Sequence, residues 1–261
     1  MKKNNIITPF CEYFEMLPAV SDELKNEVYK LRYQVYCIET GFENPEEHPG
    51  EMESDDFDRH SVHYLIRHRK SGIYAATTRL ILPDTNKINT LFPIELYSTI
   101  DNHKEPQDKQ QRHLAEASRF CVSKAFKRRK NDYQASLTGI SPDWEQKTAA
   151  AEEERRTYPH LSIALYACLI KMSHENNIHY WYALMEPALI RFFTTLGIYF
   201  KGIGPVTDYH GLRRPCMIKV SDLLEGVFEK DPSVWAMMTN KGQYEKKTER
   251  NLLKTKSIYL G

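Results

Sequence analysis

The sequence predicts an α+β protein in which one mixed sheet carries helices on its faces. Two observations support this class. Strand patterns that favour a hairpin come first, and helix, strand and helix patterns then alternate in the second half. The chain has 261 residues, of which 41% are hydrophobic, so it is long enough to bury a full core. We predict a single domain over residues 1–240 and a basic tail at 241–261.

The clearest helix pattern covers residues 21–39. Ser21 is a suitable N-cap. Apolar residues recur after it at spacings of four and three, namely Leu24, Val28, Leu31, Val35 and Ile38. Arg32 and Tyr36 lie one turn apart on a neighbouring face. A polar loop rich in proline and glutamate follows at 43–53, so the helix is expected to end before it.

Three strand patterns follow this loop. Residues 61–68 and 73–82 are joined at Lys70-Ser71-Gly72, which favours a hairpin. The third strand is expected at 113–123. After it, residues 124–157 are polar and charged, which indicates a surface insertion that is partly helical.

The second half alternates between helices and strands. An apolar helix is expected at 161–176 and an aromatic-rich strand at 178–185. Glu186-Pro187 starts another helix, because proline at the first helical position loses no hydrogen bond, and Gly197 should end it. Two closing strands should flank a Gly- and Pro-rich turn, at 198–203 and 216–220.

The composition excludes several classes of protein. The formal net charge is +1, so there is no whole-protein attraction for nucleic acid. The five cysteines are widely spaced and show no CxxC pair, which argues against a disulfide framework and a cysteine zinc site. No stretch approaches the roughly 20 apolar residues of a membrane span. We therefore expect a cytoplasmic protein without nucleic-acid partners or stable membrane insertion.

Charged residues interrupt segments that otherwise resemble buried strands. The segment Glu116-Ala117-Ser118-Arg119-Phe120-Cys121-Val122 carries an acid and a base. Arg79 interrupts the preceding strand, and an acidic cluster precedes both: Glu53, Asp55 and Asp58. Because charged groups are excluded from interiors unless they are paired, we expect these residues to share one polar site.

These motifs resemble the acyl-homoserine-lactone synthases, which make autoinducers and form a branch of the GNAT-like acyltransferases. The matching residues keep their order and spacing over about 90 residues: Arg32-Tyr33-Gln34-Val35-Tyr36, Gly41-Phe42, Glu53, Asp55, Asp58, Arg79-Leu80 and Glu116-x-Ser118-Arg119-Phe120-Cys121-Val122. This chain departs from those synthases in its length, in its tyrosine and phenylalanine at an aromatic pair, and in its charged insertion.

Later motifs look like a sister group, the PEP-CTERM/exosortase-associated acyltransferases and their N-acyl amino acid synthase relatives. The residues are Trp181-Tyr182-Ala183-Leu184-Met185-Glu186-Pro187, Leu196-Gly197-Ile198 and the segment from Gly204 to Cys216. The resemblance covers roughly residues 10–220. It implies a GNAT-like fold with a central mixed, mostly antiparallel sheet flanked by helices. It also implies transfer of a fatty acyl group from a thioester to an amine, with no permanently bound cofactor.

The residue chemistry agrees with acyl transfer. An amine is protonated near neutral pH, so a base must remove a proton, and Glu116 is the candidate, directly or through water. In this fold class the oxyanion of the reaction meets backbone N–H groups of the same strand, at Phe120, Cys121 and Val122. The resemblance implies a set of substrate-binding side chains: Glu53, Asp55, Asp58, Arg32, Arg79, Ser118 and Arg119. The alternative for most of these is scaffolding by ion pairs.

Two other signals have simpler explanations. Asp58, His60 and His63 suggest metal ligands, but His60 and His63 would point to opposite faces of a strand, so we expect no metal. Cys121 has no neighbouring base in sequence, so a buried core thiol is the better interpretation than a nucleophile.

The basic run after the motif strand has three possible roles. It comprises Lys124, Lys127, Arg128, Arg129 and Lys130. A solvated surface and nucleic-acid binding are alternatives to docking of an acidic acyl carrier protein, which we favour over nucleic acid. Residues 124–135 contain no glycine, whereas many GNAT enzymes cradle coenzyme A with a glycine-rich loop there. Acyl carrier protein is therefore the expected donor, with acyl-CoA as the alternative.

Aromatic side chains gather in the second half, and core packing or an acyl-chain tunnel would explain them: Tyr180, Trp181, Tyr182, Phe192 and Phe193.

The function predicted is an N-acyltransferase that acylates an amino acid or related amine by direct attack, without an acyl-enzyme. The alternatives are an acyl-homoserine-lactone synthase that uses S-adenosylmethionine, and a non-catalytic sensor of acyl groups or carrier protein.

Overall fold

The computed structural model describes residues 7–84, 91–101, 113–126 and 160–245. Hydrogen-bonded strands follow the order β1-β2-β3-β4-β5-β8-β6, and β7 pairs with β8. The chain divides into two compact units. Unit 1 comprises Met1–Asp58, Val62–Arg79 and Arg119–Leu165, and unit 2 comprises Arg59–Ser61, Leu80–Ser118 and Tyr166–Gly261.

Unit 1 contains the N-terminal elements. They lie wholly or largely in it: α1 (Ile7–Tyr13), β1 (Phe14–Pro18), α2 (Asp22–Tyr33), the π-helix η1 (Gln34–Glu39), the 3-10 helices η2 (Pro45–Glu47), η3 (Asp56–His60) and η6 (Lys124–Phe126), β2 (Ser61–His68) and β3 (Tyr74–Ile81). β1 pairs antiparallel with β2, with Phe14 opposite His68 and Pro18 opposite Tyr64. The predicted hairpin turn between β2 and β3 is confirmed, since the Gly72 N–H donates to the His68 carbonyl at 2.9 Å.

The predicted helix at 21–39 is confirmed in its first part and differs in its second. The Ser21 side chain accepts a hydrogen bond from the Leu24 N–H at 3.3 Å, as expected of an N-cap. From Gln34 the helix widens into the π-helix η1, which ends where the Thr40 N–H donates to the Val35 carbonyl five residues earlier. Because a π-helix has more residues per turn, the side chains after Tyr33 no longer follow the four-and-three spacing of an α-helix.

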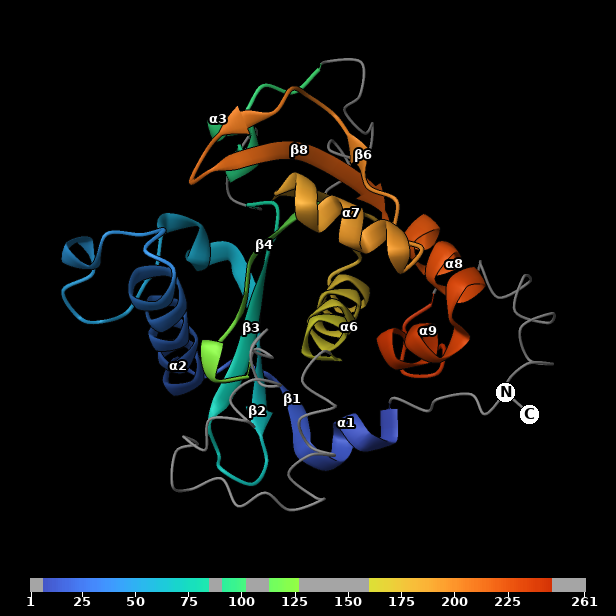
Figure 1. The fold of residues 1–261 in the computed structure, drawn as a ribbon, viewed down its shortest axis with the longest axis horizontal. Coiled ribbons are helices and arrows are strands. Elements are labelled where there is room, and N and C mark those ends of the chain that lie inside the picture. The colour runs from blue at the N-terminus through green and yellow to red at the C-terminus, as the bar shows by residue number, and fades with distance from the viewer. Residues whose placement is uncertain (1–6, 85–90, 102–112, 127–159, 246–261) are drawn as a thin grey trace, which may run out of the picture. The chain divides into compact units, whose positions relative to one another are not determined.

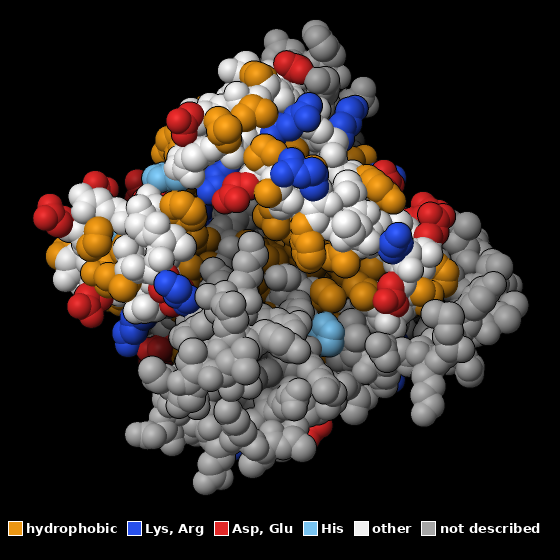
Figure 2. Space-filling view, viewed as in Figure 1, with side chains coloured by type: hydrophobic (Ala, Val, Ile, Leu, Met, Phe, Trp, Pro, Cys, Tyr) orange, Lys and Arg blue, Asp and Glu red, His pale blue; other side chains and the backbone are white. Residues whose placement is uncertain are grey.

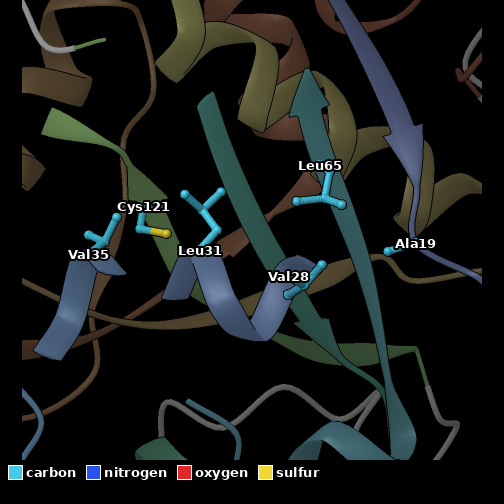
Figure 3. Close-up of a cluster of buried hydrophobic side chains, with 6 residues drawn as sticks. All are labelled: Ala19, Val28, Leu31, Val35, Leu65 and Cys121. Atoms are coloured by element: carbon cyan, nitrogen blue, oxygen red, sulfur yellow. The ribbon is translucent and has the colours of Figure 1, made fainter. Parts of the chain in front are cut away.

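A hydrophobic cluster fixes α2 against the strands of unit 1. α2 lies beside β2 and β3 (Figure 1). Its apolar face packs into a cluster of six buried residues drawn in Figure 3: Ala19, Val28, Leu31, Val35, Leu65 and Cys121. Cys121 is 4% exposed, so the prediction of a buried core thiol is confirmed. Burial of these side chains, at about 25 cal/mol per Å² of apolar surface, holds the helix in place.

Unit 2 contains most of the C-terminal elements. They are α3 (Pro93–Tyr97), β5 (Tyr180–Met185), α7 (Pro187–Thr195), β6 (Lys201–Gly202), β7 (Thr207–Asp208), β8 (Leu212–Lys219), α8 (Val220–Lys230) and α9 (Pro232–Met238). β4 (Leu114–Val122) and α6 (His160–Glu175) are divided between the units. β4 runs parallel to β5, whereas β8 runs antiparallel to β5.

Aromatic packing forms the core of unit 2. Trp181 is fully buried, and its indole N–H donates to the Ser173 hydroxyl at 2.8 Å. Tyr166 lies edge-on to Phe193, with ring centroids 4.7 Å apart. The core-packing interpretation therefore holds for Trp181 and Phe193, whereas Phe192 is 47% exposed.

Two glycines in unit 2 allow α7 and α8 to approach closely. A Cβ built on Gly226 would lie 2.1 Å from the Gly197 carbonyl oxygen, and Gly197 itself has a φ of +81°. We expect Gly226→Ala to lower the free energy of unfolding by about 1–3 kcal/mol. The backbone clash outweighs the helix propensity of alanine, which alone would stabilise by about 1 kcal/mol. Thermal unfolding measures this, and Gly50→Ala, where the nearest atom lies at 3.4 Å, is the control.

The closing segment differs most from its prediction. The strand expected at 198–203 is reduced to β6, and the strand expected at 216–220 begins earlier, at Leu212. The supposed turn contains a short hairpin in which Thr207 pairs with Arg213. His210 and Gly211 close this hairpin with positive φ values of 50° and 95°. The helices α8 and α9 were not predicted.

Some predicted features lie outside the described residues. These are most of the insertion at 124–157, including Lys127, Arg128, Arg129 and Lys130, and most of the tail at 241–261. Within the described part of the chain, no helix is both long enough and apolar enough to cross a membrane.

Candidate active site

Unit 1 contains a network of ion pairs built around three arginines. Arg32, on the inner face of α2, is fully buried and forms a two-pronged contact with Glu53. Its Nε donates to Glu53 Oε2 at 2.5 Å and its Nη2 donates to Oε1 at 2.9 Å. The Glu53 N–H in turn donates to the Tyr29 carbonyl at 3.0 Å, which ties the loop before η3 to α2. Two parallel charge-assisted bonds are the strongest pairing that arginine makes.

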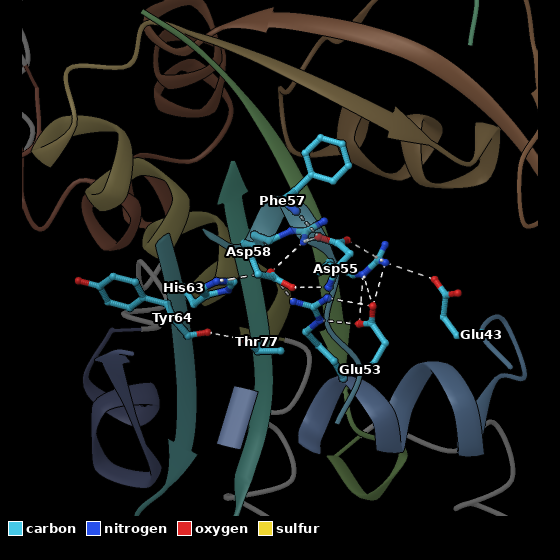
Figure 4. Close-up of polar contacts among 11 residues, drawn as sticks. Glu43, Glu53, Asp55, Phe57, Asp58, His63, Tyr64 and Thr77 are labelled. Atoms are coloured by element: carbon cyan, nitrogen blue, oxygen red, sulfur yellow. Dashed lines mark hydrogen bonds and ion pairs between the residues drawn. The ribbon is translucent and has the colours of Figure 1, made fainter. Parts of the chain in front are cut away.

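Asp58 joins two of these arginines. Its Oδ1 accepts from Arg32 Nη1 and from Arg79 Nη1, each at 2.8 Å (Figure 4). Its Oδ2 accepts from the Asp55 N–H at 2.8 Å, so the same carboxylate also shapes the turn between Asp55 and Asp58. Arg79 makes a further bond of 2.6 Å to Asp55 Oδ1. The acidic cluster and Arg79 are therefore brought together, as the sequence predicts.

Arg119 completes the network from β4. Its Nη2 donates to Glu53 Oε1 at 2.9 Å, and its guanidinium lies over the Tyr36 ring, 5.6 Å from the centroid. The same Nη2 lies 3.3 Å from both Asp55 Oδ2 and Glu43 Oε1. Arg119 has a φ of +48°, which is uncommon for a residue with a side chain and marks a local distortion of the strand.

The network changes the ionisation of its members. Burial alone would raise the pKa of Glu53, but Arg32 and Arg119 outweigh it and lower the pKa to about 2. Burial opposes the same effect at Asp58, where Arg32 and Arg79 also lower the pKa. Both carboxylates are therefore ionised at neutral pH, and their pairing contributes stability that is lost as acid protonates them.

His63 closes the buried end of the network. Its side chain is 1% exposed, and its Nε2 lies 3.6 Å from Asp58 Oδ1. Burial lowers the pKa of His63 to about 3, and Arg32 and Arg79 reinforce this against the opposing charge of Asp58. The ring is therefore neutral at pH 7. Over the described residues, no group of three or more His, Cys, Asp or Glu side chains is arranged to hold a metal ion.

Protonation of His63 should make the protein acid-sensitive. Because the pKa falls from 6.5 to about 3 on folding, the unfolded chain binds the extra proton between these values. Stability should then fall by about 1.4 kcal/mol per pH unit as pH drops below 6.5. His63→Leu should flatten the unfolding free energy over pH 6.5 to 5, as measured by chemical denaturation. A slope unchanged from the wild type would contradict this, and His48→Gln is the control.

Unit 2 contains the other candidate, Glu116. It is 3% exposed, more buried than expected for a residue facing a semi-buried cleft. Its Oε2 accepts a hydrogen bond from the Ile94 N–H at 2.8 Å, in the first turn of α3. Glu116 also lies opposite Tyr182 in the pairing of β4 with β5. The Tyr182 ring in turn packs edge-on against Phe92.

The remaining predicted residues lie on or just after β4. Ser118 is half-buried, and the backbone of Phe120, Cys121 and Val122 continues the strand after Arg119. Lys124 begins η6, where its N–H donates to Glu39 Oε2 at 2.8 Å. The structure places these residues, and their roles in catalysis and docking stay predictions.

The sequence does not identify Glu43 as a member of the network or His63 as a buried neutral side chain. It also does not identify the hydrogen bond from the Ile94 N–H to Glu116. The signal for Glu43 is the pair Gly41-Phe42 before it. Gly41 has a φ of +65°, and the Phe42 and Glu43 N–H groups both donate to the Tyr36 carbonyl, at 2.8 and 3.1 Å. This tight turn directs Glu43 back to Arg119.

Comparison with known proteins agrees with this architecture. Residues 31–135 match the model of the acetyltransferase (GNAT) domain. This match and the parallel pairing of β4 with β5 identify the fold. The chain has a GNAT-like fold. The predicted mixed, mostly antiparallel sheet is thereby confirmed, and the GNAT match is consistent with an enzyme of the acyltransferase type.

Solved structures that resemble this chain include three synthases. The AHL synthase LasI is 18% identical, with 82% of this chain and 96% of that chain covered and a TM-score of 0.52. BjaI, a CoA-dependent acyl-homoserine lactone synthase solved with SAM and isopentyl-CoA, is 15% identical, with 87% and 99% covered and a TM-score of 0.51. FeeM, an N-acyl amino acid synthase from uncultured soil microbes, is 12% identical, with 82% and 95% covered and a TM-score of 0.48. No curated protein matches the chain.

Proposed function

We propose that this protein is an N-acyltransferase that moves a fatty acyl group from a thioester on acyl carrier protein to the amine of an amino acid or related small molecule. The observation that carries this is the ion-pair network of unit 1, whose four carboxylates face three guanidinium groups. One negative charge remains, and it favours a protonated amine. The fourth carboxylate is Glu43, which joins Glu53, Asp55 and Asp58.

The reaction proceeds by direct attack. Glu116 accepts a proton from the ammonium group, directly or through water, and the free amine attacks the thioester carbonyl. Backbone N–H groups at Phe120, Cys121 or Val122 hold the oxyanion that forms. The C–N bond forms and the C–S bond breaks. The attacking nitrogen loses a second proton, which the departing thiolate takes up, and the first proton passes from Glu116 to solvent. Cys121 is buried among apolar side chains, which argues against it as an acyl carrier.

The donor follows from the segment after β4. No glycine occurs between residues 124 and 135, and this segment is basic. A carrier protein is acidic and presents only a phosphopantetheine arm, so it suits this segment better than coenzyme A does. Docking would involve Lys124 and the basic residues that follow it. The motifs between Trp181 and Cys216 support a role like that of the PEP-CTERM/exosortase-associated acyltransferases.

Lipid analysis of a producing host tests the proposal. Cells that overexpress the wild type should accumulate an N-acylated amine whose mass reveals acyl length and head group together. Cells with equal amounts of Glu116→Gln should not. A product that requires S-adenosylmethionine and contains a lactone would instead identify an acyl-homoserine-lactone synthase. Carrier binding without any product in either strain would identify a sensor.

A further inference from the structure

A patch of exposed apolar side chains lies on unit 2, on the short hairpin of β7 and β8 and on α3 beside it. Val206 directly precedes β7 and Leu212 begins β8, and these side chains are 48% and 65% exposed. Tyr97, at the end of α3, is 46% exposed. It stacks on Tyr209 with the ring centroids 4.5 Å apart, which joins α3 to the hairpin. We call Tyr97, Val206, Tyr209 and Leu212 the hairpin patch.

Polar contacts fix the hairpin, so its apolar side chains are held at the surface. Arg213 Nη1 donates to Glu186 Oε1 at 2.7 Å, and Arg213 Nη2 donates to the His210 carbonyl at 3.2 Å. The Tyr209 N–H donates to the Gly211 carbonyl at 3.0 Å across the turn. Exposed apolar side chains that a fixed backbone gathers in one place are typical of an interaction surface.

The side chains around the hairpin patch are basic. Residues 199–219 contain four lysines and arginines and one acidic residue. Lys201 and Arg214 are exposed, and neither forms an ion pair with another described residue. The Arg214 side chain lies against β6, because a Cβ built on Gly202 would lie 2.4 Å from Arg214 Nε. Figure 2 shows hydrophobic and basic side chains next to each other at the top of the view, over β6 and β8.

An anionic lipid surface suits this combination better than a second copy of the chain does. Tyrosine has an apolar ring and a polar hydroxyl, and it is enriched at membrane–water interfaces. Exposed basic side chains are attracted by the phosphates of anionic lipids. A symmetric contact between two copies would instead bring like charges together, which is unfavourable.

We propose that the hairpin patch binds peripherally to the surface of a bilayer that contains anionic lipids. Val206 and Leu212 enter the boundary between headgroups and acyl chains, where burial of their apolar surface favours binding. Lys201 and Arg214 are attracted to the headgroup phosphates. This goes beyond the proposed function, because binding requires no catalysis, and it would let a fatty acyl product pass directly into the bilayer.

Vesicle sedimentation tests the proposal on the full chain. Purified wild type is mixed with vesicles of phosphatidylcholine alone or of phosphatidylcholine with phosphatidylglycerol, and the bound fraction is measured. We expect the partition coefficient to be at least about tenfold higher for the anionic vesicles and to fall as salt is added. No binding, or equal binding to both kinds of vesicle, would overturn the proposal. Acyl transfer, measured separately on the same preparation, decides the proposed function independently.

Matched variants locate the binding surface. Leu212→Ser and Arg214→Gln should each lower the partition coefficient for anionic vesicles about fivefold. Ile73→Ser and Lys70→Gln are the controls, because they remove an apolar side chain that is 57% exposed and an exposed charge from the β2–β3 turn of unit 1. Both controls should bind as the wild type does. Wild-type binding by the patch variants, or equal losses in the controls, would show that the hairpin patch is not the lipid-binding surface.

Two other partners would give different results. A dimer in sedimentation equilibrium that Leu212→Ser dissociates would identify a second copy of the chain. Binding of an acidic carrier protein that Arg214→Gln abolishes, without binding of vesicles, would identify a protein partner. Either result would overturn the proposal.

Discussion

Arg32→Ala is expected to destabilise the protein by about 3–5 kcal/mol of unfolding free energy. The guanidinium is fully buried and bonds to both Glu53 and Asp58. Its removal leaves two buried carboxylates that are each short of a counter-charge, and their desolvation is then uncompensated. Because typical domains are stable by only about 5–15 kcal/mol, this single change should bring the protein close to unfolding at 37 °C. Urea denaturation followed by circular dichroism measures it.

An exposed pair on the same helix is the control. Lys30 bonds to Glu27 at 2.8 Å, the same length as the bond from Arg32 to Asp58, but the Lys30 side chain is 57% exposed. Lys30→Ala should therefore cost at most about 1 kcal/mol. Losses of similar size in the two variants would show that the Arg32 network does not hold α2 to the loop.

Glu116→Gln is expected to lower kcat for acyl transfer by about 10² to 10⁴. Glutamine cannot take the proton from the acceptor ammonium. Its amide oxygen still accepts the Ile94 N–H, so the fold should be retained. Steady-state kinetics with acyl carrier thioester measure kcat, and differential scanning calorimetry measures the unfolding temperature.

Comparison of two variants separates chemistry from structure at this position. Glu116→Asp keeps the base but shortens the side chain, so it should recover part of the rate that Glu116→Gln loses. If both variants unfold at the wild-type temperature and turn over as fast as the wild type, Glu116 is not the base. If they lose activity only as they lose stability, the role of Glu116 is structural.

Much of the fold and the network follow from local patterns in the sequence. Ser61–His68 is predicted with the observed bounds, because Val62, Tyr64 and Ile66 favour a strand and a glycine turn follows it. Glu186-Pro187 correctly marks the start of α7. The pairing of Arg32, Arg79 and Arg119 with the acidic cluster was also predicted, because isolated charges on apolar segments must find partners.

Other features depend on contacts that no local pattern encodes. The π-helix after Tyr33 and the positive φ of Arg119 need tertiary packing to hold them, since neither position is a glycine. β8 begins within a Gly- and Pro-rich stretch, where Pro215 discourages a strand prediction although the strand forms. Glu43 reaches Arg119 only because of the turn at Gly41, so its place in the network was not visible from spacing.

Transfer of an acyl group from a thioester to an amine can be followed in a single reaction. Purified protein is incubated with acyl carrier thioester and a mixture of amines, and mass spectrometry follows N-acyl product while a thiol reagent follows release of the carrier thiol. We expect N-acyl amide and free thiol in equal amounts, and both should form about 10² to 10⁴ times more slowly with Glu116→Gln. Thiol release without amide, or no reaction with any amine from either carrier protein or coenzyme A thioesters, would contradict acyl transfer to an amine.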